Sequence, residues 1–208
     1  TATCTVTVTA AHEYVDLGLS VKWATCNVGA DSPEGYGWYF MWGSVTEGGD
    51  PDCIWANCPG NGENSSYDAS AFGTWKSSNL TNNVLNPEVD AARANWGGDW
   101  RMPTQNEWQE LHNNTTITWT TSYNNTGVRG LIFTSKKEGY TDKYIFLPAA
   151  GSRYGTSLYS VSSTGFYWLS SLYSDDPTDA YYMLLTSGFA YPQSNSDRYG
   201  GFSVRPVQ

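Results

Sequence analysis

The segment from Tyr154 to Pro206 constrains the fold of this chain more than any other part of the sequence. Residues 179–186 within it read DAYYMLLT, and in a β-strand these side chains would alternate between two faces. One face would carry Tyr181, Met183 and Leu185. The other face would carry Tyr182, Leu184 and Thr186. The pattern therefore predicts a strand with two distinct faces.

Two interpretations of this strand stay open. If one face packs on a core, the other presents Tyr and Leu, and Phe189 and Tyr191 continue it beyond a turn at Gly188. Clustered exposed aromatic side chains usually mark a binding surface. A strand that is buried on both faces would also be apolar throughout. The polar run SNSD at 194–197 favours the surface.

The composition of residues 154–206 also favours a binding surface. Tyr, Phe, Ser, Asp and Gly are abundant there, whereas the last Lys is Lys143 and the last Glu is Glu138. Tyr offers a large, stiff and amphipathic contact area, and Ser, Gly and Asn offer adaptable hydrogen bonding, as in antibody combining sites. The segment is therefore more like a combining site than like the active site of an enzyme.

The 208 residues suffice for one large domain or two small ones. Charged residues make up 15% and aromatic residues 15%, which is typical of a loop-rich secreted or surface protein. The net charge of -9 argues against binding to nucleic acid or to anionic membranes, because both need clustered Lys and Arg. No apolar run reaches about 18 residues, so neither a transmembrane helix nor direct membrane insertion is expected.

The four cysteines allow several interpretations. Cys53 and Cys58 lie close together in a loop rich in Pro, Gly and Asn, and they could close a small disulfide. Cys4 and Cys26 could pair or remain buried thiols. A zinc site is the weakest interpretation, because the cysteines lack metal-ligand spacing and the two histidines are far away in the sequence.

Local patterns predict an α+β domain with two helices, antiparallel strands and long irregular loops. One helix is expected over 87–96, which begins with Pro and acidic residues. A second is expected over 104–112, where Thr104 and Glu107 have the spacing of a capping box. Residues 48–78, rich in Gly, Pro, Asn and Ser, are expected to form a long loop. Strands are expected in two short pieces over 13–23 and over 36–42, 117–123, 128–135 and 143–150.

Residues 1–9 alternate Thr with Cys and Val, which predicts a strand. They resemble the last strand of a bacterial immunoglobulin-like domain. Residues 1–11 are therefore expected to be the tail strand of a preceding immunoglobulin-like domain or a linker. No signal peptide is visible, and the sequence is expected to be trimmed from a longer chain.

Six motifs occur in order along the rest of the chain. They read EYVDLGLSVKW (13–23), YGWYFMWG (36–43), WRMPTQNEW (100–108), FLPAAG (146–151), YWLSS (167–171) and GFSVRP (201–206). With these motifs, residues 12–208 resemble the C-type-lectin-fold domains of surface proteins from gut Bacteroidetes such as Bacteroides and from their phages. More specifically, the chain resembles the variable proteins of diversity-generating retroelements, which are related in fold to formylglycine-generating enzymes.

The resemblance implies a mechanism of diversification. In such systems, reverse transcription scrambles adenines of a template that is copied into the 3′ end of the gene. Template Asn codons (AAY) can then become many residues, but not Lys, Glu, Gln, Met or Trp. The absence of Lys and Glu after Lys143 fits this rule.

The resemblance implies a variable, ligand-binding region over about 154–202. Its candidate ligand-binding residues are Tyr154, Tyr159, Phe166, Tyr173, Ser174, Asp176, Thr178, Asp179, Tyr182, Leu184, Thr186, Phe189, Tyr191, Ser194, Ser196, Asp197, Gly200 and Phe202. The expected framework residues are Trp168, Tyr181, Met183, Leu185, Val204 and Arg205.

Enzymatic interpretations fit the sequence less well. The WRMPT motif is similar to a stretch of formylglycine-generating enzymes, but those enzymes need a reactive cysteine pair near the C-terminus. This chain has Ser203 there and no cysteine after Cys58. His112, at the end of a predicted helix, is more commonly an exposed residue near the helix C-terminus than a member of a Ser/His/Asp triad. The aspartates at 175–179 most simply form a solvated acidic loop, and the calcium motifs of animal C-type lectins are absent.

We therefore expect a binding domain that is not an enzyme, with no cofactor, no metal site and no catalytic residue. The expected ligand is a protein or a glycan on another cell or particle, and the expected role is receptor recognition. The expected location is extracellular, at the cell surface, or on a phage particle. The alternative is a carbohydrate-binding adhesin module that is not diversified.

Overall fold

The computed structural model describes residues 12–208, so the strand expected at 1–9 lies outside the described residues. The described part is a mixed α+β structure in which every pair of named strands is antiparallel. The predicted α+β class is therefore confirmed. None of the helices within 12–208 combines the length and the apolar character needed to cross a bilayer.

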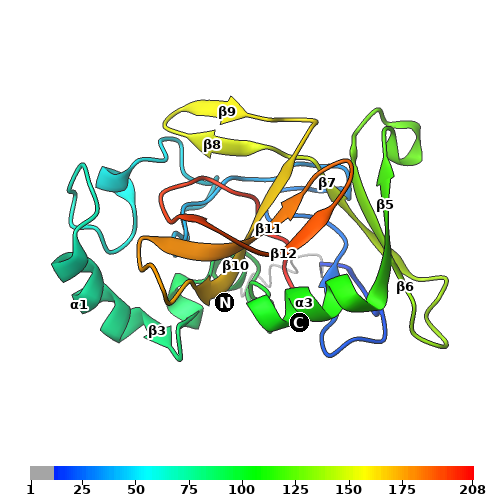
Figure 1. Cartoon of the computed structure of the whole chain (residues 1–208), viewed down its shortest axis with the longest axis horizontal. Helices are drawn as coiled ribbons and strands as arrows, with labels where there is room; N and C mark the ends of the chain where they lie inside the picture. Colours follow the sequence, from blue (N-terminus) through cyan, green and yellow to red (C-terminus); the bar gives the residue numbers. More distant parts are fainter. Residues whose placement is uncertain (1–11) are drawn as a thin grey trace, which may run out of the picture.

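The largest sheet has five strands in the order β12-β11-β10-β4-β3. Its strands are β3 (Leu80–Thr81), β4 (Val84–Leu85), β10 (Gly165–Leu172), β11 (Asp179–Leu185) and β12 (Ala190–Asp197). The alternating run DAYYMLLT thus forms β11, except for its last residue, and β11 lies inside the sheet between β10 and β12 (Figure 1).

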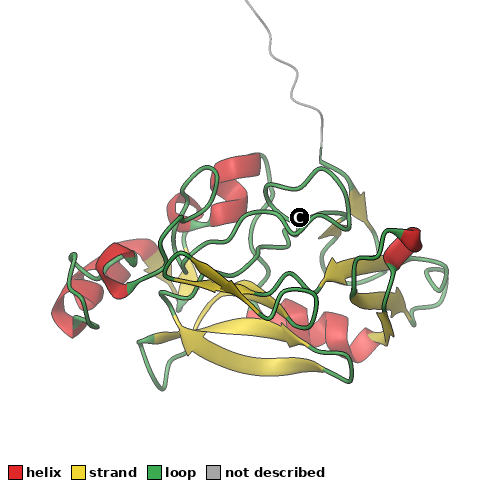
Figure 2. Cartoon of the chain, turned by 90° about the horizontal axis from the view of Figure 1, so that it is seen from above, coloured by secondary structure: helices red, strands yellow, loops and turns green. Residues whose placement is uncertain are grey.

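Smaller sheets complete the architecture. A three-stranded sheet contains β5 (Thr115–Thr120), β6 (Gly130–Ser135) and β7 (Tyr144–Pro148). Two hairpin-like pairs are formed by β1 (Tyr14–Val15) with β2 (Trp23–Ala24) and by β8 (Ser152–Tyr154) with β9 (Ser157–Tyr159). Figures 1 and 2 show the β5–β7 sheet toward one end of the long axis and helix α1 at the other, with strands β10 to β12 and irregular loops between them.

The helices confirm one prediction closely and correct another. Helix α3 (Gln105–Asn114) begins at Thr104, and the expected capping box between Thr104 and Glu107 is present. The helix expected over 87–96 is a short 3-10 turn (Pro87–Val89) followed by α2 (Ala91–Trp96). Helix α1 (Ala69–Asn79) lies, except for its last residue, inside the segment 48–78 that was expected to be a long loop.

Helix α1 escaped prediction because its own sequence has little helical character. Only Phe72 among its residues is buried, and Gly73 lies in its middle. The helix begins at Asp68, whose carboxylate accepts hydrogen bonds from the N–H groups of Ser70 and Ala71 at 2.9 Å each. This cap and the packing of Phe72 against Trp75 and the rest of the core stabilise a helix that intrinsic propensity does not predict.

The strand expected over 36–42 is also corrected. Residues 39–42 are buried, as expected, but they form no ladder and share one isolated bridge between Phe40 and Phe202. The Phe40 N–H donates to the Phe202 carbonyl at 2.9 Å, and the Phe202 N–H donates back at 3.0 Å. An extended backbone with a single bridging residue is not a strand, although its aromatic side chains fill the core.

Strands β10 and β11 lie between two hydrophobic clusters. The first cluster includes Tyr167, Leu169, Met183, Leu185, Trp108, Leu111 and Phe133. The second includes Trp168, Leu172, Ala180, Tyr182, Phe40, Trp42, Phe72 and Phe202. The odd-numbered face of β11 therefore packs on α3 and the β5–β7 sheet, whereas the even-numbered face packs on the side of α1 and α2.

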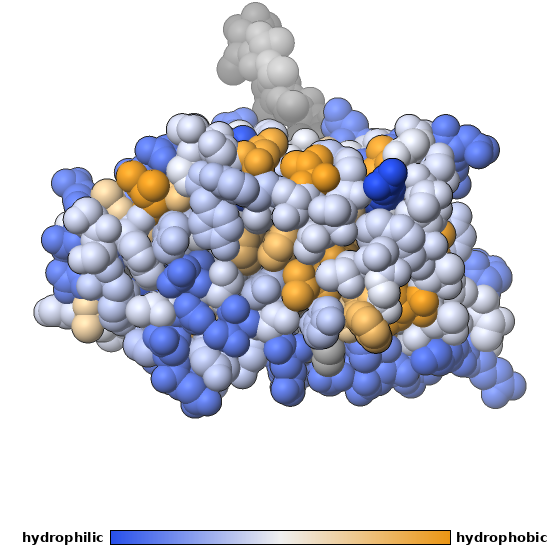
Figure 3. All heavy atoms as spheres, turned by 45° about the horizontal axis from the view of Figure 1, so that its top comes forward, coloured by the Kyte–Doolittle hydropathy of each residue, from blue (hydrophilic) through white to orange (hydrophobic). Residues whose placement is uncertain are grey.

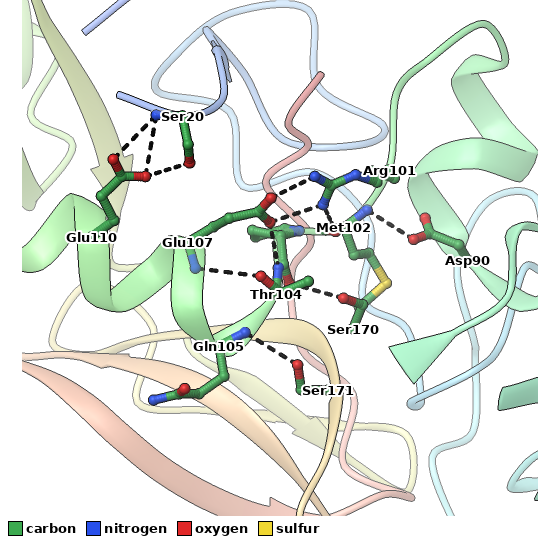
Figure 4. A network of polar contacts seen from close by, with 11 residues as sticks. Ser20, Asp90, Arg101, Met102, Thr104, Gln105, Glu107, Glu110, Ser170 and Ser171 are labelled. Carbon is green, nitrogen blue, oxygen red and sulfur yellow. Dashed lines mark hydrogen bonds and ion pairs between the residues drawn. The ribbon is translucent and has the colours of Figure 1, made fainter. Parts of the chain in front are cut away.

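A polar network ties α3 to the preceding segment (Figure 4). The Arg101 guanidinium donates to both carboxylate oxygens of Glu107, at 2.8 Å and 2.5 Å. The Thr104 N–H donates to the same carboxylate at 2.8 Å, and the Met102 N–H donates to Asp90 Oδ2 at 2.8 Å. The motif WRMPT thus fixes the start of α3 relative to α2.

Candidate functional site

The predicted alternation along β11 is confirmed by its packing. Met183 and Leu185 are buried in the first cluster, with Tyr181 packed against it, whereas Tyr182 belongs to the second cluster. Tyr182 is only 9% exposed, so around residues 182–183 the strand is buried on both faces. Leu184 and Thr186 are half-buried, so the even-numbered face opens only toward the end of the strand.

Three predicted ligand-binding residues are buried, which corrects their assignment to the surface. They are Tyr182, Gly200 and Phe202. The Phe202 ring stacks on Trp168 with centroids 4.2 Å apart and lies 5.2 Å from Phe166. Gly200 lies under this ring, because an added Cβ would come within 3.0 Å of it. These residues form the floor beneath the candidate surface and cannot contact a ligand without rearrangement.

Above this floor lies a half-exposed aromatic group. The Tyr154 ring is 6.1 Å from Tyr159 and 5.7 Å from Tyr199, and its hydroxyl lies 3.4 Å from Ser196 Oγ. Tyr159 is 52% exposed. Phe166, Leu184, Ser194 and Ser196 belong to the same face by strand register and are half-buried. We call these residues, with Tyr154 and Tyr159, the aromatic face.

A second group is acidic and lies at the far end of the β11–β12 ladder. Asp179 and Asp197 are directly cross-strand, and the Asn195 amide donates to Asp179 Oδ2 at 2.6 Å. Burial, together with the carboxylates of Asp179 and Asp176, raises the pKa of Asp197 above its ordinary value. By alternation these side chains face away from Ser194 and Ser196, so they are not part of the aromatic face.

The loop after β10 carries the rest of the acidic group. Ser174 and Asp176 are exposed, while Tyr173 and Thr178 are half-buried. The Thr178 N–H and hydroxyl both donate to Asp176 Oδ1, at 3.0 Å and 2.7 Å, and these hydrogen bonds lower the pKa of Asp176. The loop is therefore a hydrogen-bonded turn with exposed polar side chains.

The third group is the tip of the β11–β12 hairpin. Phe189 is 64% exposed and Tyr191 is 43% exposed, and their rings are 5.8 Å apart. Phe189 also lines a cavity of about 220 Å³ with His112, Ile117 and Trp119, on the side of α3 and β5. The structure thus distributes the candidate residues over three neighbouring patches rather than over one continuous stripe.

The expected framework residues are mostly buried. Trp168, Met183, Leu185, Val204 and Arg205 have no exposed surface, and Tyr181 is half-buried. Arg205 Nε donates to Asn27 Oδ1 at 2.9 Å, and Nη1 donates to the carbonyls of Ala24 and Thr25. The framework therefore joins the C-terminal segment to the first strands of the domain.

Arg198 is a further residue of this region that sequence patterns did not single out. It is fully buried, and its guanidinium carbon lies 3.6 Å from the Phe72 ring centroid. Its Nε donates to the Pro177 carbonyl at 3.0 Å, and its Nη1 donates to the Pro59 carbonyl at 3.1 Å. Arg198 thereby fastens the acidic loop to α1 and to the preceding loop. The sequence does contain one indication of a special role for Arg198, because Arg198 and Arg205 are the sole basic residues in 154–206.

The cysteine thiols within 12–208 and the Ser203 hydroxyl, considered above as reactive groups, are buried. Cys53 and Cys58 are buried free thiols, so the small disulfide considered for them is not formed. Cys26 is buried, and Cys4, its possible partner, lies outside the described residues. Ser203 is buried, and its hydroxyl donates to the Tyr36 carbonyl at 3.2 Å. Within 12–208 no group of three His, Cys, Asp or Glu side chains is arranged to hold a metal ion.

Comparison with known families finds one match. Residues 119–207 match a domain of unknown function (DUF8237). The match begins within β5 and extends beyond β12, so it includes every candidate ligand-binding residue but none of the helices α1 to α3. Comparison with curated proteins and with solved structures finds no match.

Proposed function

We propose that residues 12–208 form a C-type-lectin-fold ligand-binding domain of a surface protein, and that residues 154–202 are diversified to recognise varied targets, chiefly proteins. The observation that carries the proposal is the contrast within the C-terminal region. Tyr159 is exposed above a floor in which Trp168 and Phe202 are fully buried. Phe189 and Tyr191 are exposed at the neighbouring hairpin tip.

This contrast is what a diversified binding site requires. Substitutions of exposed side chains usually change stability by less than about 0.5 kcal/mol, whereas substitutions in a packed floor cost several kcal/mol. Exposed Tyr and Phe residues supply contact area, and the neighbouring Ser and Asp residues supply hydrogen bonds. Figure 3, which brings the β8–β9 side forward, shows a face of mostly intermediate hydropathy, with strongly hydrophilic residues gathered along its lower rim.

The diversification half of the proposal is tested in the DNA around the gene. We expect a near-copy of the bases that encode residues 154–202, differing from the gene where the copy has adenines. The codons for exposed candidates such as Tyr159, Phe189 and Tyr191 should be among the differing positions. If no such copy exists, the surface belongs to a receptor or adhesin with one fixed ligand.

The binding half is tested with displayed libraries of the domain. One library randomises the five exposed candidate residues, Tyr159, Ser174, Asp176, Phe189 and Tyr191. A matched control library randomises five exposed residues elsewhere, Tyr14, Glu138, Thr141, Asp142 and Tyr144. Both libraries are selected against lysozyme and serum albumin.

The first library should yield folded binders with dissociation constants below about 1 μM, and the control library should not. Equal yields from the two libraries would show that the C-terminal region has no special capacity for binding. Loss of folding in most members of the first library would show that its residues support the core instead.

A further inference from the structure

A cavity of about 270 Å³ lies between the β3–β4 turn, the first turn of α3 and strands β10 and β11. Its lining residues are Asn82, Asn83, Val84, Thr104, Gln105, Asn106, Ser171, Leu172 and Tyr181. None of the predicted ligand-binding residues belongs to this set. The cavity is therefore separate from the three candidate patches, although Tyr181 adjoins the acidic group.

The lining is polar but carries no charged side chain. It contains four carboxamides, two hydroxyls and one phenol, and its apolar part is Val84 and Leu172. A buried or half-buried ion would find no counter-ion here, and an unpaired charge is costly away from water. The uncharged polar lining therefore favours a neutral ligand over an ionic one.

Most of the hydrogen-bonding capacity of the lining is not used by other protein groups, and Asn82 and Asn106 are exposed to solvent. Within residues 12–208, the side chains of Asn82, Asn83, Gln105 and Asn106 form no hydrogen bond to another residue, and neither does the Tyr181 hydroxyl. Each carboxamide offers two N–H donors and one carbonyl acceptor. The lining therefore presents donors and acceptors together, as a ligand with several hydroxyl groups requires.

The backbone segments that carry the carboxamides are held in place. Asn82 and Asn83 form the β3–β4 turn with positive φ of 53° and 62°, and the Asn83 carbonyl accepts from the Leu172 N–H at 2.8 Å. On the other side, the Gln105 N–H donates to Ser171 Oγ at 3.1 Å (Figure 4). Turn and helix are thus both fastened to β10, which limits the backbone entropy lost when a ligand binds.

We infer that this cavity binds a neutral sugar ring. The carboxamides and hydroxyls would contact the hydroxyl groups of the sugar, and the apolar C–H face of the ring would pack on Tyr181 and the two aliphatic side chains. The volume lies just below the usual range of ligand pockets, so the part of a ligand that enters the cavity is about one sugar ring. This inference does not depend on the proposed function of the candidate patches.

The inference is tested by NMR titration of the labelled domain with the methyl glycosides of glucose, galactose, mannose and N-acetylglucosamine. At least one glycoside should shift the side-chain amide signals of Asn82, Asn83, Gln105 and Asn106 in a saturable way, with a dissociation constant on the order of 1 mM. Glucuronate and glucosamine, tested as charged analogues, should bind at least about tenfold more weakly.

Three variants distinguish loss of ligand binding at the cavity from a general effect of substitutions in α3. Gln105→Ala and Asn106→Ala lie in the first turn of α3, where Ala is well tolerated, and each should weaken binding about tenfold or more. Gln109→Ala, one turn further along α3 and outside the cavity, should leave binding unchanged. Absence of saturable shifts for all four glycosides, or equal binding by the three variants, would overturn the inference.

Discussion

At the residue scale, Phe189 and Phe202 carry the same side chain in opposite surroundings. Phe202 is fully buried among Phe166, Trp168 and Tyr182, whereas Phe189 is 64% exposed. Phe202→Ala should lower the free energy of unfolding by about 3–5 kcal/mol, because it removes buried apolar contacts and leaves a cavity. Phe189→Ala should change it by less than about 0.5 kcal/mol.

Urea unfolding of the two variants and the wild type measures this difference directly. Each variant serves as the matched control of the other, because the substitution is chemically identical. Similar losses of stability in both variants would mean that the hairpin tip is packed as tightly as the floor, and Phe189 would then no longer be a candidate contact residue.

The positions of Phe202 and Gly200 could not be derived from the sequence for a definite reason. Alternation predicts which way a side chain points only inside a regular strand, and β12 ends at Asp197. Phe202 lies beyond this end and is oriented by a bridge to Phe40, more than a hundred residues earlier. By contrast, strand parity correctly predicted which residues of β11 share a face. It did not predict the burial of Tyr182 on the even-numbered face, because parity does not say what packs against a face.

At the element scale, α3 was predictable because its signals are local. Thr104 and Glu107 form the capping box, and Trp108 and Leu111 are its buried residues. The signals of α1 are not local, since Phe72 is its one buried residue and its neighbour Arg198 comes from the other end of the domain. Local patterns could therefore predict α3 but not α1.

The Glu107 carboxylate connects α3 to pH-dependent stability. Burial alone would raise its pKa, but hydrogen bonds from Arg101 and from the Thr104 backbone outweigh burial, and the net pKa is lowered. A depressed pKa in the folded state means that this stabilisation is present above the ordinary value near 4.5 and is lost as the pH falls further.

Glu107→Gln should therefore lower stability at pH 7 by about 1–2 kcal/mol, with a smaller difference from wild type at pH 3. Denaturant midpoints measured between pH 3 and pH 7 test this expectation. Glu88→Gln, at an exposed residue just before α2, is the control and should follow the wild type at every pH. A constant gap between Glu107→Gln and wild type would contradict the assigned ion pair.

At the scale of the whole molecule, the last residues of the chain join segments that are far apart in the sequence. Val207 bridges Trp23 and Arg101, and the Val28 N–H donates to the Val204 carbonyl at 3.0 Å. No sequence pattern specifies such pairings, because an isolated bridge involves one residue pair and leaves no alternation of side chains to read. The α+β class could be predicted from local elements, but the joining of the two hydrophobic clusters by this segment could not.

Buried phenol and thiol groups also predict how the stability of the molecule responds to alkali. Burial raises the pKa to about 12 for four side chains, Tyr39, Cys53, Cys58 and Tyr123. Their ordinary values are 9.0 for Cys and 10.0 for Tyr. Because the folded protein holds these protons more tightly, stability from this source is complete below pH 9 and is lost as the pH rises toward 12.

The free energy of unfolding, measured with denaturant, should therefore stay level up to about pH 9 and then decline. The decline should reach up to about 1.4 kcal/mol per pH unit for each group that titrates in the unfolded chain alone. Tyr39→Phe tests the cause. It loses the hydrogen bond from Tyr39 to the Ala150 carbonyl, so it should be less stable at pH 7, but its alkaline decline should be shallower. Parallel curves for Tyr39→Phe and wild type between pH 9 and pH 11.5 would contradict a buried phenol at this position. A shallower decline in the variant would instead show that ionisation of a buried group, the Tyr39 phenol, contributes to the loss of stability of the domain at alkaline pH.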